Sequence, residues 1–236
     1  MDLFTTLLII AALVAAFGGI AYYAHLQEKK RRELLAAFAL ELGWEFDPTT
    51  DRTLDDRFPQ FDCFRRGDSR YAHNSLRGSL LLATGAAEEC NLHAQAGDYH
   101  YTVTSGSGKN RTTTTYRFSY LMIMAPTTAG HDLRIKRENW GDKMKAAMGF
   151  DDIDFESAEF SDRFWVKSRD KRFAYDVIHP RMMEFLMNGP TPTIEIDRGV
   201  LCLYGSGSRW EPHEFKMRMR WASGFFALWP RHLLAT

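Results

Sequence analysis

The sequence predicts an α+β protein that is carried on one N-terminal transmembrane helix. An uncharged run at the N-terminus is followed by segments rich in β-branched and aromatic residues between about 61 and 125. Short helices and hairpins then alternate up to a long final helix, an order typical of α+β domains rather than of wound parallel sheets. We therefore expect a transmembrane anchor at 1–25, a juxtamembrane helix at 26–43 and a soluble α+β domain at 44–236, with antiparallel hairpins in its β-rich half.

Composition excludes two classes of protein. Thirty basic residues balance thirty acidic ones, whereas a nucleic-acid-binding domain usually has a basic excess, so no nucleic acid partner is expected. Cys63, Cys90 and Cys202 are odd in number and far apart. This pattern favours reduced, buried thiols over a secreted disulfide framework.

The apolar run extends from Leu3 to Ala24 without a charged residue. A helix of this length covers a hydrocarbon core of about 30 Å. A cleaved signal peptide is the alternative, but it needs a basic region before the run, and only Asp2 stands there. The pattern therefore favours an uncleaved single-pass anchor, with membrane lipid as its partner.

Charge on the two sides of the run predicts its orientation. Lys29, Lys30, Arg31 and Arg32 follow the span, and no basic residue precedes it. The positive-inside rule then places the N-terminus outside the cell membrane and the soluble domain in the cytoplasm. The same cluster could attract anionic lipid at about 1 kcal/mol per residue, but a plain stop-transfer flank is the favoured explanation.

Small residues recur within the span at Ala11, Ala15 and Gly19. This spacing places them on one helix face, where a second helix can approach closely. A homodimer is therefore one candidate assembly, beside a different protein partner.

Periodicity predicts the elements of the domain. A helix over 28–42 leads into a short strand at 44–46, and a hairpin joins 99–103 to 113–124. Trp44, Phe155, Phe164 and Phe185 are expected in the core. The elements expected in the second half are a helix at 138–148, strands at 152–155 and 164–166, helices at 171–178 and 180–187, a hairpin over 193–204 and a helix from Pro212 to Trp229.

The final helix has an apolar stripe that widens towards its end. Phe215, Met219, Ala222, Phe226 and Trp229 share one face. Such a helix is either buried in the core or in contact with lipid. The second reading makes the widened end a candidate interface with the membrane, formed by Trp221, Phe225 and Trp229.

Several short blocks resemble a family of uncharacterised bacterial single-span membrane proteins with a cytoplasmic α+β domain of unknown function. The likeness covers most of the chain. It is carried by Gly97 to Tyr101, Gly149 to Phe155, Phe160-Ser161, Phe164, Asp170, Ala174 and Pro180 to Met183. The resemblance implies the same layout and assigns no catalytic residue.

Motifs that suggest chemistry do not match their templates. The Gly106 to Asn110 segment lacks the first glycine and the hydroxyl residue of a phosphate-binding loop. The acidic residues from Asp151 to Glu156 lack the glycine and glutamate of a calcium loop. Cys90, His93 and His100 lack a spacing that requires zinc. We therefore assign no catalytic, cofactor-binding or metal-binding residue.

The predicted function is a membrane-tethered cytoplasmic interaction domain without catalytic activity. The alternative is a membrane-proximal, hydrolase-like enzyme whose site is assembled from residues distant in sequence. A deep polar pocket with converging ionisable side chains would favour the enzyme, and an apolar patch would favour the binding domain.

Overall fold

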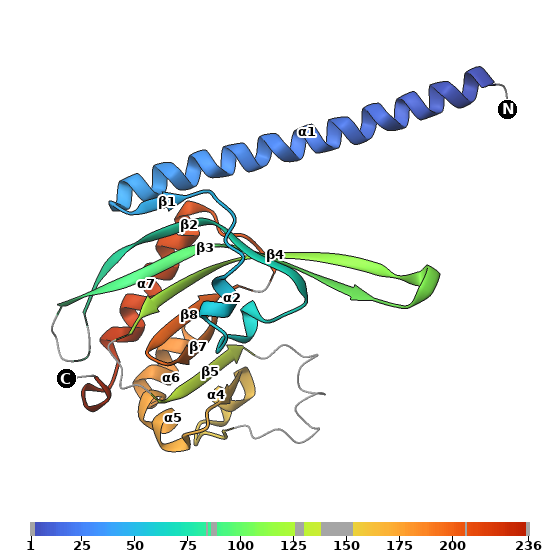
Figure 1. Cartoon of the computed structure of the whole chain (residues 1–236). Coiled ribbons are helices and arrows are strands. Elements are labelled where there is room, and N and C mark those ends of the chain that lie inside the picture. The colour runs from blue at the N-terminus through green and yellow to red at the C-terminus, as the bar shows by residue number, and fades with distance from the viewer. Residues whose placement is uncertain are drawn as a thin grey trace.

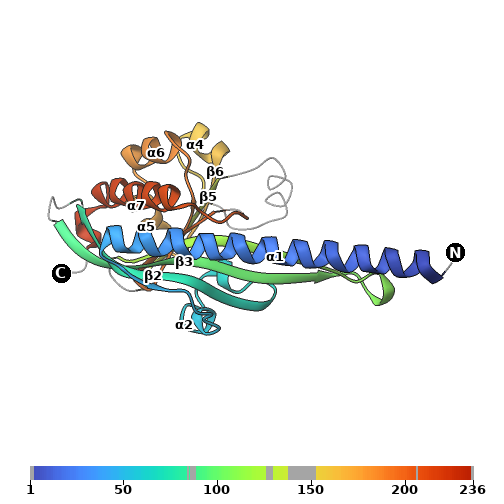
Figure 2. The ribbon, with the colours of Figure 1, turned by 90° about the horizontal axis from the view of Figure 1, so that it is seen from above.

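A computed structural model describes residues 3–83, 85, 89–125, 130–137, 153–205 and 207–234. An eight-stranded antiparallel sheet forms the centre of the domain (Figure 1). A long N-terminal helix packs on it through its C-terminal part and projects beyond it through its N-terminal part. Seen from above, helices α4, α6 and α7 lie on one side of the sheet and α2 lies on the other (Figure 2).

The helices begin at residues that satisfy their free amides. Ser157, Asp170 and His179 accept bonds from backbone N–H groups in the first turns of α4, α5 and α6. A capping box between Glu211 and Glu214 opens α7. The helices are α1 (Leu3–Leu42), α2 (Leu54–Arg57), α4 (Ala158–Arg163), α5 (Lys171–Val177), α6 (Pro180–Met187) and α7 (Pro212–Ala227).

The sheet has the strand order β1-β2-β3-β4-β8-β7-β5-β6. Its long strands β2, β3 and β4 follow one another as hairpins, and β8 pairs with β4. A tight turn with positive φ at Arg198 and Gly199 joins β7 to β8. The strands are β1 (Glu45–Asp47), β2 (Asp68–Ala83), β3 (Glu89–Ser105), β4 (Thr112–Met124), β5 (Asp132–Arg137), β6 (Phe164–Lys167), β7 (Thr193–Asp197) and β8 (Val200–Tyr204).

Each face of the sheet has its own hydrophobic core. Along β4, Leu121 and Ile123 point to the face that the helices cover, and Tyr120 and Met122 point to the opposite face. The period of two residues in a strand produces this division. The second core is closed by the segment around α2, which contributes Leu54, Phe61, Cys63 and Phe64.

A glycine in β2 makes room for the residue that follows α1. A Cβ atom on Gly78 would lie 2.3 Å from the indole ring of Trp44. That indole donates a hydrogen bond of 3.1 Å to the carbonyl of Ser79. The chain that leaves α1 is therefore fixed against β2 immediately.

The predicted α+β class is confirmed, with its long N-terminal helix, antiparallel hairpins and final helix. From Leu3 to Leu42, the segments expected at 1–25 and 26–43 form one continuous helix. The strand expected at 152–155 is wrong, because residues 153–155 have no regular structure. A backbone hydrogen bond of 3.1 Å from the Ile153 amide to the Val166 carbonyl links this segment to β6. The helix expected at 138–148 lies outside the described residues.

Three of the four expected core residues are buried. Trp44, Phe155 and Phe164 are at most 8% exposed. Phe185 is only half-buried, and its ring lies 5.3 Å from that of Trp221. The α6 helix therefore shields α7 without being enclosed itself.

Phe64→Ala should lower the free energy of unfolding by about 3–5 kcal/mol, because Phe64 is fully buried beside Tyr99 and Tyr120. Urea unfolding of the full chain in non-ionic micelles measures this. Phe185→Ala is the matched control and should lower the free energy of unfolding clearly less, because the Phe185 ring is only half-buried. Equal losses would contradict the assignment of a separate, closed core behind the sheet.

Candidate functional site

One face of α1 docks on the domain. Arg31, Leu35, Phe38 and Ala39 are buried, at the spacing of three and four residues that places side chains on one helix face. The ring of Phe38 lies 6.2 Å from that of Phe215 on α7. The described part of the helix before Glu28 remains almost wholly exposed. The buried face therefore begins at Arg31, seven residues after the apolar run ends at Ala24.

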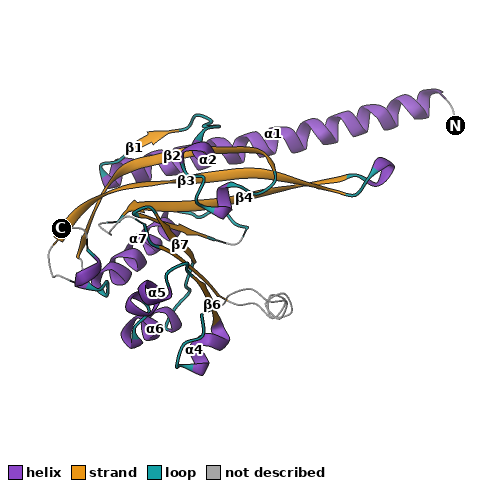
Figure 3. Ribbon diagram, turned by 60° about the horizontal axis from the view of Figure 1, so that its bottom comes forward, coloured by secondary structure: helices purple, strands orange, loops and turns teal. Residues whose placement is uncertain are grey.

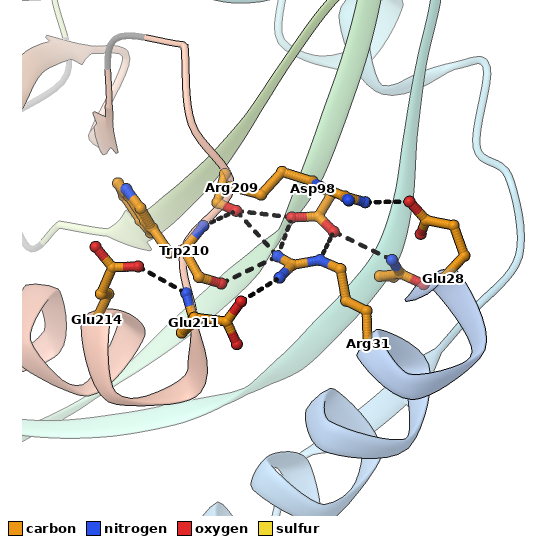
Figure 4. A network of polar contacts seen from close by, with 9 residues as sticks. Glu28, Arg31, Asp98, Arg209, Trp210, Glu211 and Glu214 are labelled. Atoms are coloured by element: carbon orange, nitrogen blue, oxygen red, sulfur yellow. Dashed lines mark hydrogen bonds and ion pairs between the residues drawn. The ribbon is translucent and has the colours of Figure 1, made fainter. Parts of the chain in front are cut away.

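Arg31 binds Asp98 through two parallel hydrogen bonds (Figure 4). Its Nε and Nη2 atoms donate to the two carboxylate oxygens, each over 2.7 Å. The arginine is 7% exposed and the aspartate is 0% exposed. Such bidentate pairing is the strongest geometry for an ion pair, and it also fixes the orientation of both groups.

Two neighbouring strands complete the coordination of Asp98. Ser119 on β4 donates to the carboxylate over 2.7 Å, and the Asn74 amide on β2 donates over 3.1 Å. Asp98 follows Ala94 and Ala96 on the helix-covered face of β3, so an acidic group stands where the alternation expects an apolar one. Its position is explained by the cation and the two donors that surround it.

A local irregularity of β2 brings Asn74 to this position. Asn74 has a φ of 53°, and the register of β2 shifts between His73 and Leu76. A Cβ atom on Gly97 would lie 3.3 Å from the Asn74 carbonyl. The bulge and the glycine together allow β2 to approach the carboxylate closely.

The same network reaches the start of α7. The carbonyl of Trp210 accepts from Arg31 Nη2 over 3.0 Å, and its amide donates to Ser119 Oγ over 2.8 Å. Glu211 lies 3.8 Å from Arg31, and Arg209 pairs with Glu28 one turn earlier on α1. The network therefore joins α1, three strands and the N-terminus of α7 at one point.

The ionisation of the pair follows from its surroundings. Burial alone would raise the pKa of Asp98, but the bonds and charge of Arg31, with the donors Ser119 and Asn74, lower that pKa overall. Burial alone would lower the pKa of Arg31, but Asp98 outweighs it, and that pKa is raised. Both groups are therefore charged at neutral pH.

The structure divides the predicted basic flank. Lys29, Lys30 and Arg32 are exposed around α1, whereas the side chain of Arg31 turns into the domain. Arg31 is therefore unavailable to lipid, because its donors bind protein acceptors. A pocket of about 510 Å³ beside it is lined by Gln27, Lys30, Arg31, Leu34, Arg209 and Glu211.

The three residues of the predicted lipid interface lie mostly in the core. Phe225 is 0% exposed and Trp229 is 1% exposed. Of the two alternatives for this helix, burial in the core therefore applies to both residues. Phe173 of α5 lies against Trp229, with ring centroids 6.1 Å apart. Trp221 is half-buried between Phe185 and Phe225.

A polar pocket of about 450 Å³ lies beside β5 and β7. Its most buried ionisable group is Glu195, whose pKa is raised by burial although Arg134 and Tyr204 act against the shift. Tyr204 donates to Glu195 over 2.7 Å, and the Asp62 amide donates to it over 3.0 Å. The pocket thus assembles ionisable residues distant in sequence, but protein donors already bind the oxygens of its carboxylate.

The buried thiols are poor candidates for a nucleophile. Burial raises the pKa of both Cys63 and Cys202, so both are protonated at neutral pH. Within the described part of the chain, no three His, Cys, Asp or Glu side chains are grouped to hold a metal ion. A third pocket, largely apolar and of about 750 Å³, is lined by residues 154–157 and by residues of α5, α6 and their connection, including Met183 and Met187.

The chain matches no family model and no curated protein. Among solved structures, it is similar to the crystal structure of the mycobacterial trehalose monomycolate transport factor A, TtfA. The sequence identity is 8%, the TM-score is 0.49, and the match covers 84% of this chain and 96% of that one. A likeness at this level carries no argument about function.

The Arg31–Asp98 junction is absent from the sequence predictions. The sequence indicates Arg31 only as part of the basic flank, and Asp98 only as part of the Gly97 to Tyr101 block. Two signals could have indicated the pair. Arg31 continues the stripe of Leu35, Phe38 and Ala39, and Asp98 occupies an inward position of a strand.

Arg31→Ala should lower the free energy of unfolding by about 3–5 kcal/mol, because it leaves the Asp98 carboxylate buried without its cation. Lys30→Ala, at an exposed position one residue earlier, should change it by less than about 0.5 kcal/mol. Urea denaturation in non-ionic micelles measures the free energy of unfolding of both variants. Similar values for both variants would show that the pair does not hold the helix in place.

The stability lost in Asp98→Asn should depend on pH. The lowered pKa of Asp98 stabilises the fold fully above its unfolded value of about 3.9, and this stabilisation disappears as the pH falls through the lower folded value. The difference between wild type and Asp98→Asn should therefore be largest near neutral pH and shrink below about pH 4. A difference that is constant from pH 7 to pH 3 would contradict an ionised Asp98.

Proposed function

We propose that the protein is a membrane-tethered interaction module whose cytoplasmic domain is held in one orientation relative to the bilayer. The observation that carries this proposal is the continuity of α1. The same helix contains the uncharged run and the docked face, with no break between Leu3 and Leu42. A rigid connection of this kind transmits the direction of the span to the domain.

The exposed apolar side chains of α1 support its placement in a bilayer. In the most apolar window of α1, none of the residues is buried inside the structure, and the helix is long and apolar enough to cross a membrane. Leu3, Val14 and Phe17 are each at least 67% exposed. A surface of this kind is costly in water, and lipid would cover it.

The orientation rests on the exposed part of the basic flank. Lys29, Lys30 and Arg32 remain at the surface after the span, and no basic residue precedes it. Three exposed cations on one side still favour a cytoplasmic domain under the positive-inside rule. The loss of Arg31 from the flank does not change this direction.

An interaction role is supported by the way in which the domain is built. The buried ion pair and the apolar face of α1 serve to position the domain, and the ionisable residues of the polar pocket pair with one another. Ala11, Ala15 and Gly19 lie at the exposed surface of α1, where a second copy or another membrane helix can pack. The partner is therefore expected at or near the bilayer.

The second candidate is an enzyme that uses the polar pocket. The observation in its favour is the raised pKa of Glu195, which suits a general acid. If this is correct, wild type should hydrolyse a member of an ester, phosphoester and glycoside panel, and Glu195→Gln should abolish the turnover. Activity that survives Glu195→Gln would exclude this pocket as the site.

A reporter fused after Thr236 tests the orientation. A fluorescent protein should fluoresce in the membrane fraction, and alkaline phosphatase at the same place should be inactive, because the exposed Lys29, Lys30 and Arg32 retain this side in the cytoplasm. An epitope placed at residue 1 should remain on the mature protein. Active phosphatase would contradict the orientation, and loss of the epitope with release from the membrane would show a cleaved signal peptide.

A further inference from the structure

Strands β3 and β4 continue beyond the sheet as a two-stranded arm, residues 102–117. Strand β2 begins opposite Thr102, and the pairing of β4 with β8 begins only at Tyr120. Within the arm the register runs from Thr102 opposite Thr115 to Ser105 opposite Thr112. Figures 1, 2 and 3 all show the arm projecting towards the same end of the molecule as the N-terminus of α1.

The reach of the arm can be compared with that of the helix, because Arg31 and Asp98 fix a common starting level. From Asp98 to Ser105, β3 extends roughly 23 Å at about 3.3 Å per residue. From Arg31 back to Ala24, where the uncharged run ends, α1 covers roughly 10 Å at about 1.5 Å per residue. The tip of the arm therefore passes the level at which the helix enters the hydrocarbon.

A span perpendicular to the bilayer would carry this tip into the hydrocarbon layer. The tip is unsuited to it, because Gly108–Asn110 form a single 3-10 turn within the loop between the two strands, and Arg111 is exposed. Irregular backbone and charged groups do not face lipid tails. An inclined span removes the conflict by raising the tip to the headgroup layer, and transmembrane helices commonly incline by about 20°.

The chemistry of the arm suits that layer. The sequence from 102 to 117 contains Lys109, Arg111 and Arg117 and no acidic residue, in a chain with no net charge. Arg111, Arg117 and the hydroxyl residues Thr112–Thr115 are exposed, and Tyr116 is 39% exposed. Basic side chains bind anionic headgroups, and tyrosine is favoured at the interface.

We propose that the arm is a second membrane contact, which rests on anionic lipid headgroups and holds α1 at an inclination to the bilayer normal. This proposal rests on the anchoring of α1 in the membrane. Two contacts, at the exit of the helix and at the tip of the arm, define the plane of the membrane relative to the domain. The faces of the domain that remain accessible to a partner are then determined by the arm as well as by the helix.

Depth-dependent fluorescence quenching of the full chain in nanodiscs tests the contact. A fluorophore on Ser107→Cys reports on the tip, in a Cys90→Ser background because Cys63 and Cys202 are buried. Nanodiscs contain phosphatidylcholine alone or with phosphatidylglycerol, and the quencher is attached to the headgroups. A second fluorophore, on Ile9→Cys with an acyl-chain quencher, reports separately on the anchor.

The Ser107 probe should be quenched in nanodiscs with phosphatidylglycerol. Each basic side chain near an anionic surface contributes roughly a five-fold preference, so Arg111→Gln with Arg117→Gln should lower the ratio of docked to free arm about 25-fold. High salt should have the same effect. The matched control Arg181→Gln with Arg220→Gln, at exposed positions on α6 and α7, should leave quenching unchanged.

Three outcomes would overturn the proposal. An unquenched Ser107 probe beside a quenched Ile9 probe would reject the arm contact and leave the anchor intact. An unquenched Ile9 probe would reject the anchor, and with it the arm contact. A Ser107 probe that is shielded equally in pure phosphatidylcholine, and only at high protein concentration, would show that the arm binds a second copy of the chain instead.

Discussion

The structure depends on the buried ion pair between Arg31 and Asp98. Two charges removed from water are costly unless other groups bind them, and here Ser119, Asn74 and the Trp210 carbonyl hydrogen-bond to the pair. An apolar contact alone would let the helix slide or rotate on the sheet with little loss. A bidentate pair has one geometry, so it selects one rotation and one register for α1.

The position of the ion pair affects residues that are far apart in the sequence. The bulge at Asn74 and the close approach at Gly97 are local departures from regular strands that serve the carboxylate. The segment before α7 is held by the same groups, so the final helix, the sheet and α1 share one anchoring point. The free-energy cost of removing the two charges from water is offset by the apolar contacts of the neighbouring Leu35 and Phe38.

Local patterns in the sequence predict most elements but not their junction. The hairpin from β3 to β4, the turn at Arg198 and Gly199 and the proline-started helices α6 and α7 each depend on neighbouring residues, so their signals are readable. Arg31 and Asp98 are 67 positions apart, and their pairing requires the rotation of α1 and the bulge in β2 together. The short strand β5 is absent from these predictions, although Leu133 and Ile135 alternate with charged residues as in a half-buried strand. The core position of Trp229 depends on α5, which packs over it.

The central claim is that the ion pair holds α1 in one orientation on the domain. Electron spin resonance measures it directly as the distance distribution between nitroxides on Gln27→Cys in α1 and Asn188→Cys after α6, in the full chain with Cys90→Ser. A single narrow distribution that broadens in Arg31→Ala, and does not broaden in Lys30→Ala, is the predicted result. A broad distribution in the wild type, or one equally narrow in Arg31→Ala, would contradict the account.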